Sequence, residues 1–217
     1  MCRKQCSPSR YSITRWSELL TQIIEQAKSQ SVYEIVAVIT AIAYLGLAIR
    51  QNIACWYFAA FSTAIYIGLF IEARLYMESL LNAFYFIMAI YGWYIWRSGG
   101  DVGESRPVAT WSWTTHLGAM LVIGVLSVGS GMYLDATSDA AYPYIDSLTT
   151  WFAIWATFLV AQKVLENWWY WLVIDIASIM IYWSRDLQLT ALLFVVYVIM
   201  IPFGIVSWSR SMREQST

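Results

Sequence analysis

A single carboxylate lies in the middle of one of the most apolar stretches of this chain, residues 167–183. In a membrane-spanning helix, Asp175 costs about 2.5–3.5 kcal/mol on insertion scales, and such groups are usually functional. Trp171 and Asn167 lie four and eight positions earlier and therefore share its helix face. Tyr182, seven positions later, lies on the same side. A polar and aromatic stripe on an otherwise apolar helix predicts a binding site that faces the protein interior.

Two structural explanations of this stripe stay open. Asp175 could pair with a basic group at a helix end, for which Lys163 and Arg185 are the candidates. Tryptophans near the start of a membrane span often belong to an interfacial belt. We assign that role to Trp169, which points away from the stripe, and keep Trp168 with the candidate site.

The residue types of the stripe do not predict an enzyme. The sequence contains no recognisable nucleophile–base pair, phosphate-binding loop or cluster of metal ligands, and Asp175 has no second buried acid beside it. The chain has a single histidine, His116, to which we assign no chemistry. We therefore expect no catalysis, no bound metal and no cofactor.

The overall composition is that of an integral membrane protein. The chain has 217 residues, of which 59% are hydrophobic and 12% charged, whereas soluble domains carry about 25% charged residues. Its 13 Trp and 15 Tyr residues suit the aromatic belts found at both membrane interfaces. A net charge of −1 gives no reason to expect nucleic-acid binding.

Seven apolar stretches are long enough to cross a membrane as helices. Each has about 17–20 residues, which at 1.5 Å per residue crosses a hydrocarbon core of roughly 30 Å. Residues 1–31 are expected to form a polar tail and an amphipathic helix, the latter at 11–31. The predicted spans are 32–50, 53–71, 79–96, 114–134, 148–164, 167–183 and 189–208, followed by a polar C-terminal tail at 209–217.

The third and seventh spans repeat one sequence at a single fixed offset. The identical pairs are Leu80/Leu192, Leu81/Leu193, Tyr85/Tyr197, Ile87/Ile199, Met88/Met200, Gly92/Gly204 and Trp96/Trp208. We align the second span with the sixth at an offset one position longer, which pairs Trp56 with Trp169 and Ser62 with Asp175. The glycines of this repeat are expected to permit close packing of helices.

The repeat divides the chain into two similar halves. A first three-helix repeat occupies residues 32–96, loops and a linker helix occupy 97–147, and a second three-helix repeat occupies 148–208. Because the linker helix crosses the membrane once, both repeats have the same orientation. Transporters built from such parallel repeats bind their substrates near the midplane, at the repeat interface.

The repeat also extends the candidate site to other spans. On the second span, the equivalent stripe is Phe58, Ser62 and Tyr66, which is less polar than the stripe around Asp175. We therefore expect an asymmetric site that receives most of its polar contacts from the second half. The third and seventh spans add Asn82, Tyr85 and Tyr197.

Two groups of motifs occur in a fixed order, one in each half. The first half has EARLY at 72–76 and YGWYIW at 91–96, and the second has Glu166-Asn167-Trp168 through Asp175 and Tyr182, then LTALL at 189–193. Together they resemble the signatures of the PnuC family of nicotinamide riboside transporters. The resemblance covers roughly residues 35–208. Asn82 stands where that family often carries glutamine.

The resemblance implies an all-α, SWEET-like fold with seven transmembrane helices in a 3+1+3 arrangement. It also implies a homotrimer in the lipid bilayer of the bacterial inner membrane. The implied activity is facilitated uptake of nicotinamide riboside by alternating access, driven by phosphorylation of the substrate inside the cell. The alternative is a vitamin-binding membrane subunit, of the thiamine or riboflavin class, that requires an ATPase partner.

Nicotinamide riboside presents a flat cationic pyridinium, a carboxamide and a ribose. Trp171 and Trp168 are expected to stack on the ring, where a cation–π contact contributes roughly 0.5–2 kcal/mol. Asn167 is expected to pair with the carboxamide or a ribose hydroxyl, and Asp175 to accept ribose hydroxyls or offset the pyridinium charge. The complete set of expected substrate-binding residues is Asn167, Trp168, Trp171, Asp175, Tyr182, Asn82, Tyr85, Phe58, Ser62, Tyr66 and Tyr197.

Charges at the helix ends favour a cytoplasmic C-terminus. In that orientation six basic residues lie on the cytoplasmic side and the acidic stretch 135–147 lies outside. This distribution agrees with the positive-inside rule. The six are Arg50, Arg97, Arg106, Lys163, Arg210 and Arg213. The opposing loops hold only Arg74 and Arg185. The basic N-terminal tail favours the reverse orientation, but its charges are spread along the amphipathic segment and carry less weight.

Overall fold

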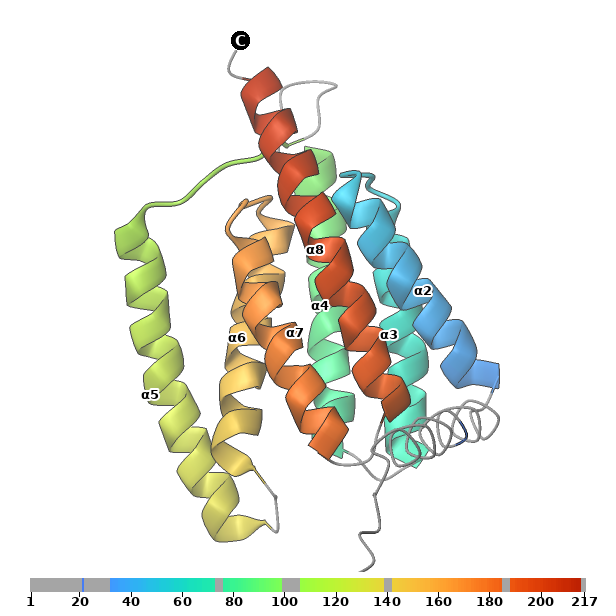
Figure 1. Cartoon of the computed structure of the whole chain (residues 1–217), viewed down its shortest axis with the longest axis vertical. Coiled ribbons are helices and arrows are strands. Elements are labelled where there is room, and N and C mark those ends of the chain that lie inside the picture. Colours follow the sequence, from blue (N-terminus) through green and yellow to red (C-terminus); the bar gives the residue numbers. More distant parts are fainter. Residues whose placement is uncertain are drawn as a thin grey trace, which may run out of the picture.

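The computed structural model describes residue 21 and residues 32–72, 76–98, 106–138, 142–184 and 188–215. Within these ranges the chain forms seven helices joined by short connections (Figure 1). They are α2 (Val32–Ile49), α3 (Cys55–Glu72), α4 (Tyr76–Ser98), α5 (Trp113–Thr137), α6 (Pro143–Ala161), α7 (Asn167–Ser184) and α8 (Gln188–Glu214). The amphipathic helix predicted at 11–31 lies outside the described residues except for Thr21.

Each predicted span coincides with one of these helices, usually to within three residues at either end. The fifth span was placed too late. Helix α6 begins at Pro143, because proline suits the first turn of a helix, where its missing N–H is not needed. It ends at Ala161, because the chain turns at Lys163 with a positive φ of 51°. Helix α8 continues to Glu214, beyond the predicted end at 208.

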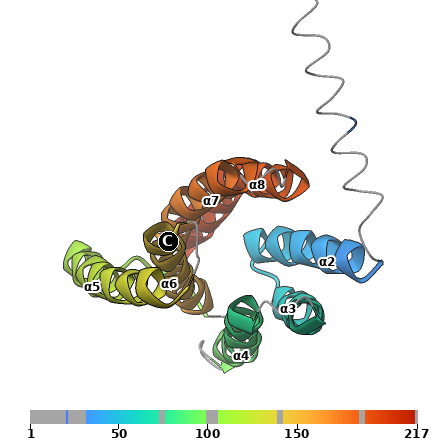
Figure 2. The ribbon, with the colours of Figure 1, turned by 90° about the horizontal axis from the view of Figure 1, so that it is seen from below.

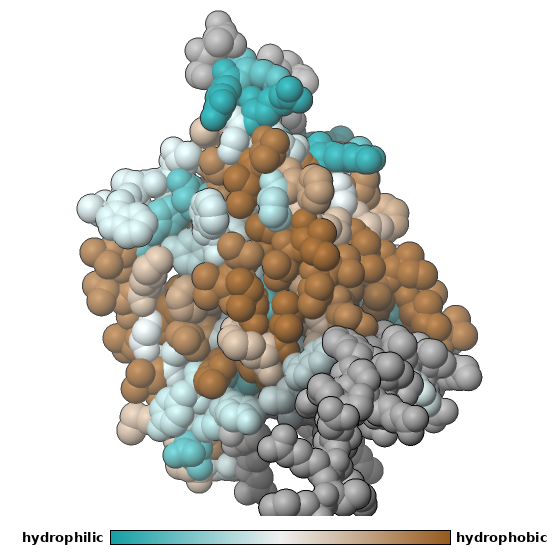
Figure 3. All heavy atoms as spheres, in the orientation of Figure 1, coloured by the Kyte–Doolittle hydropathy of each residue, from teal (hydrophilic) through white to brown (hydrophobic). Residues whose placement is uncertain are grey.

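The described helices are those of a multi-pass membrane protein. Five of them, α2, α4, α5, α6 and α8, are long and apolar enough to cross a membrane by length and composition. Helix α3 is also apolar, but the stretch found to be apolar, Cys55–Leu69, is shorter, while polar and aromatic side chains lower the hydropathy of α7. Figure 3 shows a broad apolar band across the face in view, with the most hydrophilic residues toward its ends.

Six helices form a closed ring. Helix α2 packs on α3, α3 on α4, α4 on α6, α6 on α7, α7 on α8, and α8 returns to α2. Seen along the helix axes, the six helices are arranged around a central region (Figure 2). Helix α5 stands outside the ring and packs against α6. The ring places one face of α7, with Asp175, in the interior.

The last two helices of each half are related by one constant offset. Helix α3 begins at 55 and α7 at 167, while α4 begins at 76 and α8 at 188. The longer offset predicted for the second span is therefore wrong by one position. The structural counterpart of Trp56 is Trp168, since both indoles are 2% exposed, whereas Trp169 is 56% exposed. Asp175 consequently corresponds to Thr63 and not to Ser62.

The two interfaces between the halves contain the same hydrogen bond. At the α4–α6 interface, the indole Nε1 of Trp96 donates to the carbonyl oxygen of Val160 over 3.3 Å. At the α8–α2 interface, Trp208 Nε1 donates to the carbonyl oxygen of Ala48 over 2.9 Å. The two donors, and likewise the two acceptors, are related by the offset of the repeat. Each carbonyl lies in the last turn of its helix and also accepts a backbone N–H, from Lys163 or Gln51, so the indole adds a second bond that joins the two halves.

Candidate functional site

Asp175 is buried inside the helix ring. Its side chain belongs to the middle of α7, it is 3% exposed, and its Oδ1 has no hydrogen-bond partner among the described residues. Buried polar atoms are normally paired, so an unpaired one calls for an explanation, such as a role in binding. This carboxyl group is the feature around which the candidate site is built.

Tyrosines from four helices lie near this carboxyl group or near one another. Tyr85 of α4 and Tyr197 of α8 lie close enough to Asp175 to interact with it electrostatically. Tyr182 of α7 interacts with Tyr85, and Tyr66 of α3 interacts with both Tyr182 and Tyr197. The structure thus brings together residues that were predicted from separate spans. Their hydroxyl groups can each donate and accept hydrogen bonds.

Tyr44 belongs to the same group and was missed in the sequence. It projects from α2 and interacts electrostatically with Tyr85 and Tyr197. Tyr44 shares its helix face with Ala37, seven residues earlier, and Ala48, four residues later. Both alanines are buried, so this face of α2 points into the protein. Together, the tyrosines of α2, α3, α4, α7 and α8 form what we call the tyrosine cluster: Tyr44, Tyr66, Tyr85, Tyr182 and Tyr197.

Flat aromatic surfaces line the same interior. The ring of Tyr182 stacks on Phe194, with centroids 5.3 Å apart and planes 12° apart. Phe194 in turn meets Tyr197 edge to face at 5.7 Å. Trp171, one turn before Asp175 on α7, is partly buried and packs against both hydrophobic clusters of the core. The site therefore offers stacking surfaces beside hydroxyl and carboxyl groups, which suits a planar ligand with a polar substituent.

Asn167 and Trp168 share the helix but lie at a different level. They are in the first turn of α7, about 10–12 Å along the axis from Asp175 at 1.5 Å per residue. Asn167 is fully buried and its Nδ2 donates to the carbonyl oxygen of Val164 over 2.6 Å. The ring of Trp168 packs edge to face on Trp208 at 5.4 Å. Both side chains stabilise the end of the bundle that carries the C-terminus.

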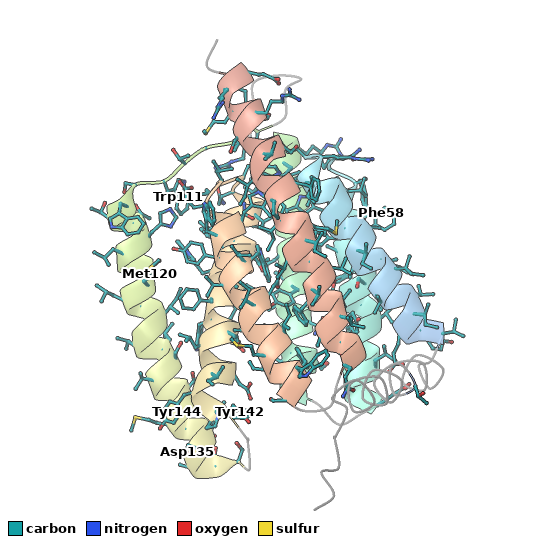
Figure 4. All side chains as sticks on the ribbon, in the orientation of Figure 1. Phe58, Trp111, Met120, Asp135, Tyr142 and Tyr144 are labelled. Atoms are coloured by element: carbon teal, nitrogen blue, oxygen red, sulfur yellow. The ribbon has the colours of Figure 1, made fainter. Side chains whose placement is uncertain are left out.

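Some of the site residues predicted from the first half lie toward the interior of the ring, and others do not. Asn82 lies one turn before Tyr85 on α4 and is partly buried. Ser62 is buried, but its Oγ donates to the carbonyl oxygen of Ala37 over 2.9 Å, which ties α3 to α2. Phe58 is 37% exposed and points outward from the bundle (Figure 4). Tyr66 and Tyr85 are thus the first-half residues that the structure brings toward Asp175.

Lys163 does not pair with Asp175, so this candidate partner of the acid is wrong. Its ammonium lies over the ring of Trp96, 4.6 Å from the centroid, at the end of the bundle. Arg185, the other candidate, lies outside the described residues. Trp169 is exposed, as expected of a belt residue.

His116 has a structural role that the sequence did not reveal. It is 3% exposed in the first turn of α5, and its Nδ1 lies 3.0 Å from the hydroxyl oxygen of Tyr170 on α7. Its Nε2 is 3.9 Å from Glu166. Glu166 also accepts a hydrogen bond from the backbone N–H of Trp111, which lies at the same end of the molecule (Figure 4). These contacts connect α5 to the second half.

A closed ring of apolar helices around a buried polar and aromatic interior is typical of membrane transporters. A family model, described as nicotinamide mononucleotide transporter, matches residues 31–210. The chain belongs to this family.

Curated relatives and a solved structure are similar over most of the chain. The nicotinamide riboside transporter PnuC of Escherichia coli is 24% identical over 209 residues, covering 85% of this chain and 87% of the relative. PnuC of Neisseria mucosa is 23% identical over 193 residues, covering 83% and 73%. The riboflavin/roseoflavin transporter RibM of Streptomyces davaonensis is 23% identical over 176 residues, covering 79% and 82%. A crystal structure of the vitamin B3 transporter PnuC shares the fold, with a TM-score of 0.68, 21% identity and 90% coverage of each chain.

Proposed function

We propose that this protein carries nicotinamide riboside across the bacterial inner membrane by facilitated diffusion and alternating access. The observation that carries the proposal is the buried carboxyl group of Asp175, which lies near Tyr85 and Tyr197 of the tyrosine cluster. A buried carboxylate is costly unless a positive charge accompanies it. A pyridinium nucleoside brings that charge, a flat ring for stacking, and hydroxyl groups for the tyrosines.

The charge of the site favours a nucleoside over a nucleotide. Phosphate groups are usually held by arginine, lysine or helix N-termini. The described basic residues of the second half, Lys163, Arg210 and Arg213, lie in the α6–α7 turn or near the end of α8, away from Asp175. A phosphate beside the carboxyl group of Asp175 is repelled at close range. We therefore infer that the riboside binds and that its 5′-phosphate is excluded.

We propose that the substrate contacts come from the part of the ring between Trp171 and Tyr182. The residues we assign to it are Trp171, Asp175, Tyr182, Asn82, Tyr85, Tyr66 and Tyr197, to which we add Tyr44. Stacking on the aromatic rings orients the pyridinium, and the hydroxyl and carboxyl groups bind the ribose. Cation–π contacts in such a desolvated site contribute roughly 2 kcal/mol.

We also propose that α2–α4 and α6–α8 are two parallel, SWEET-like repeats joined by α5 in a 3+1+3 arrangement, and that three copies assemble into a homotrimer. The constant offset between α3 and α7 and between α4 and α8 supports the repeat, as do the equivalent bonds of Trp96 and Trp208. Alternating access then follows from movement of one repeat against the other around a site at their interface.

The proposal is tested with purified protein in liposomes. We expect uptake of labelled nicotinamide riboside down its gradient without ATP, an ion gradient or a partner protein. Nicotinamide mononucleotide is the negative control, and riboflavin tests the substrate class named for the RibM relative. Tight binding of nicotinamide riboside without any flux contradicts facilitated transport and favours a subunit that needs an ATPase. Preferential uptake of riboflavin contradicts the proposed substrate.

The site itself is tested by Asp175→Asn and Trp171→Ala. Each is expected to weaken nicotinamide riboside binding about tenfold, which corresponds to about 1.4 kcal/mol, because one removes the counter-charge and the other a stacking surface. Calorimetry of the purified protein measures the change. Trp169→Ala is the matched control, since this indole is 56% exposed on the same helix and is expected to leave the Kd unchanged. Unchanged affinity in both test variants removes α7 from the site.

A further inference from the structure

Four tryptophans form a continuous layer across the helix ring. The rings of Trp56 and Trp96 meet edge to face at 5.4 Å, as do those of Trp168 and Trp208. Trp96 and Trp208 meet across the interface of the two halves at 6.1 Å. All four side chains are at most 2% exposed. We call these residues the tryptophan layer.

The tryptophan layer lies between the candidate site and the end of the bundle that carries the C-terminus. Trp168 precedes Asp175 by seven residues, or about 10 Å along α7. Trp96 and Trp208 bind the carbonyl groups at the ends of α6 and α2, so the layer is joined to both halves. A solute that leaves the site toward this end must separate these rings.

A single ammonium group is buried against this layer. Lys163 lies in the turn between α6 and α7, is 0% exposed, and places its Nζ 4.6 Å from the ring centroid of Trp96. No carboxylate pairs with it in the part of the chain that the structure describes. The segment around Ala109 covers the turn, since Ala109 N–H donates to the carbonyl oxygen of Lys163 over 3.0 Å.

The charge is not needed to build the turn. In the turn between α2 and α3, Gln51 occupies the equivalent position of the repeat, with φ of 53° against 51° for Lys163. Gln51 is partly exposed, and within the described ranges no cation lies over Trp208, the counterpart of Trp96. The buried cation is therefore a feature of one half that the fold does not require.

The surroundings of Lys163 disfavour its charged form while the layer is closed. Burial lowers the pKa of Lys163 to about 8, and the guanidinium of Arg106 adds to this effect. The thiol of Cys55, the other titratable group that faces it from the packed elements, acts in the opposite direction. Loss of water is the largest of these three influences. Opening the layer returns the ammonium to water, so the charge favours opening.

We propose that Lys163 makes the tryptophan layer a gate that opens preferentially for a cationic solute. A positively charged ring that approaches the layer from the site repels the buried ammonium, and opening relieves both this repulsion and the missing hydration. An uncharged solute of the same shape gives no such repulsion. This inference rests on the proposed function for its substrate, but the gating role of Lys163 is measurable without any substrate.

The selectivity is tested with nicotinamide riboside and its uncharged dihydro form, a nearly isosteric pair. In liposomes, Lys163→Gln is expected to lower kcat for the cation about three- to tenfold and to leave kcat for the dihydro form nearly unchanged. Glutamine is chosen because Gln51 occupies the equivalent turn. Lys163→Arg retains the charge and is expected to retain the ratio of the two rates. Arg97→Gln is the matched control, since it removes an exposed cation 5.2 Å from Trp93.

The pH profile gives a readout that a structural role does not affect. Lys163 is charged below its pKa of about 8 and neutral above it. The rate advantage of the cationic solute is therefore expected to be complete below pH 8, to disappear as the pH rises through 8, and to be absent at all pH values in Lys163→Gln.

Cys55 reports the opening of the layer without substrate. This thiol is fully buried in the same core cluster as the four tryptophans. With Cys2 and Cys6 replaced by serine, a maleimide is expected to label Cys55 more slowly in Lys163→Gln than in the wild type or Lys163→Arg. Equal labelling of the folded variants, or an unchanged rate ratio and pH profile, overturns the gating role. If the wild type neither binds nor transports nicotinamide riboside, the proposed function fails, and the labelling rates still decide the role of Lys163.

Discussion

At the scale of single residues, two glycines determine where the tryptophan layer forms. Gly92 of α4 and Gly204 of α8 face the indole rings of Trp56 and Trp168, and a Cβ on either would overlap the indole. The close packing predicted from the repeated glycines is confirmed, and its partner in each case is a tryptophan of the neighbouring helix. The absence of a side chain at these positions lets each indole enter the interior of the helix ring.

Gly204→Ala is therefore expected to destabilise the protein. The added Cβ would lie 2.5 Å from the Trp168 ring, which must move, and overpacking of this kind costs about 1–3 kcal/mol. The thermal midpoint in detergent measures the effect. Gly68→Ala is the control, because a Cβ there meets nothing within 4 Å and alanine favours the helix. A midpoint that falls equally in both variants contradicts this account.

The sequence predicted the residue types of the candidate site better than their positions along the helices. Helical periodicity placed Asp175, Trp171 and Asn167 on one face, and that face is interior. Periodicity cannot show which residues of a face meet which neighbouring helix. Asn167 was included in the predicted site, and in the structure its Nδ2 is used by the α6–α7 turn, while its Oδ1 is buried without a partner among the described residues. Tyr44 was missed for the reverse reason, because its neighbours come from other helices.

At the scale of helices, two equivalent hydrogen bonds join the halves of the molecule. The bonds from Trp96 to Val160 and from Trp208 to Ala48 connect a tryptophan of one half to a helix end of the other. Each carbonyl oxygen also accepts a backbone N–H, from Lys163 at Val160 and from Gln51 at Ala48, so loss of the indole N–H removes the bond between the halves and leaves the helix end capped. Movement of the halves against one another must break both bonds.

Trp96→Phe and Trp208→Phe are each expected to lower the unfolding free energy by about 1–2 kcal/mol, since the aromatic ring remains and the hydrogen bond is lost. Because the two rings are in contact, the double variant is expected to depart from additivity. Unfolding in mixed micelles measures all three. Trp169→Phe, at an exposed indole of α7, is expected to change little. Similar losses at Trp169 and Trp96 rule out the hydrogen bonds as the cause.

Hydropathy was a reliable guide to the helices because each must fill the thickness of the membrane. It was a poor guide to the alignment of the two halves. Pairing Trp56 with Trp169 instead of Trp168 shifted the second span by one residue relative to the sixth. Both residues are tryptophans, so identity did not distinguish them. Burial against Gly204 and Trp208 distinguishes them in the structure.

At the scale of the whole molecule, charge separates the two ends of the bundle. The end that carries the C-terminus holds the described basic residues, among them Arg50, Arg97 and Arg210. The opposite end, near the α5–α6 connection, holds Asp135 and Asp146, and Asp135 lies at that end in Figure 4. The positive-inside rule thus favours a cytoplasmic C-terminus, and the tryptophan layer then lies on the cytoplasmic side of the site.

This orientation is tested with single cysteines in a variant whose native cysteines are replaced by serine. Asp135→Cys is expected to react with a membrane-impermeant maleimide in intact cells, because that end faces outward. Arg213→Cys, near the end of α8, is expected to react only after the membrane is permeabilised. Both positions are exposed in the structure, so failure to react reports the membrane barrier and not burial. The reverse labelling pattern would place the tryptophan layer and Lys163 on the outer side, and Lys163 would then act on substrate entry instead of release.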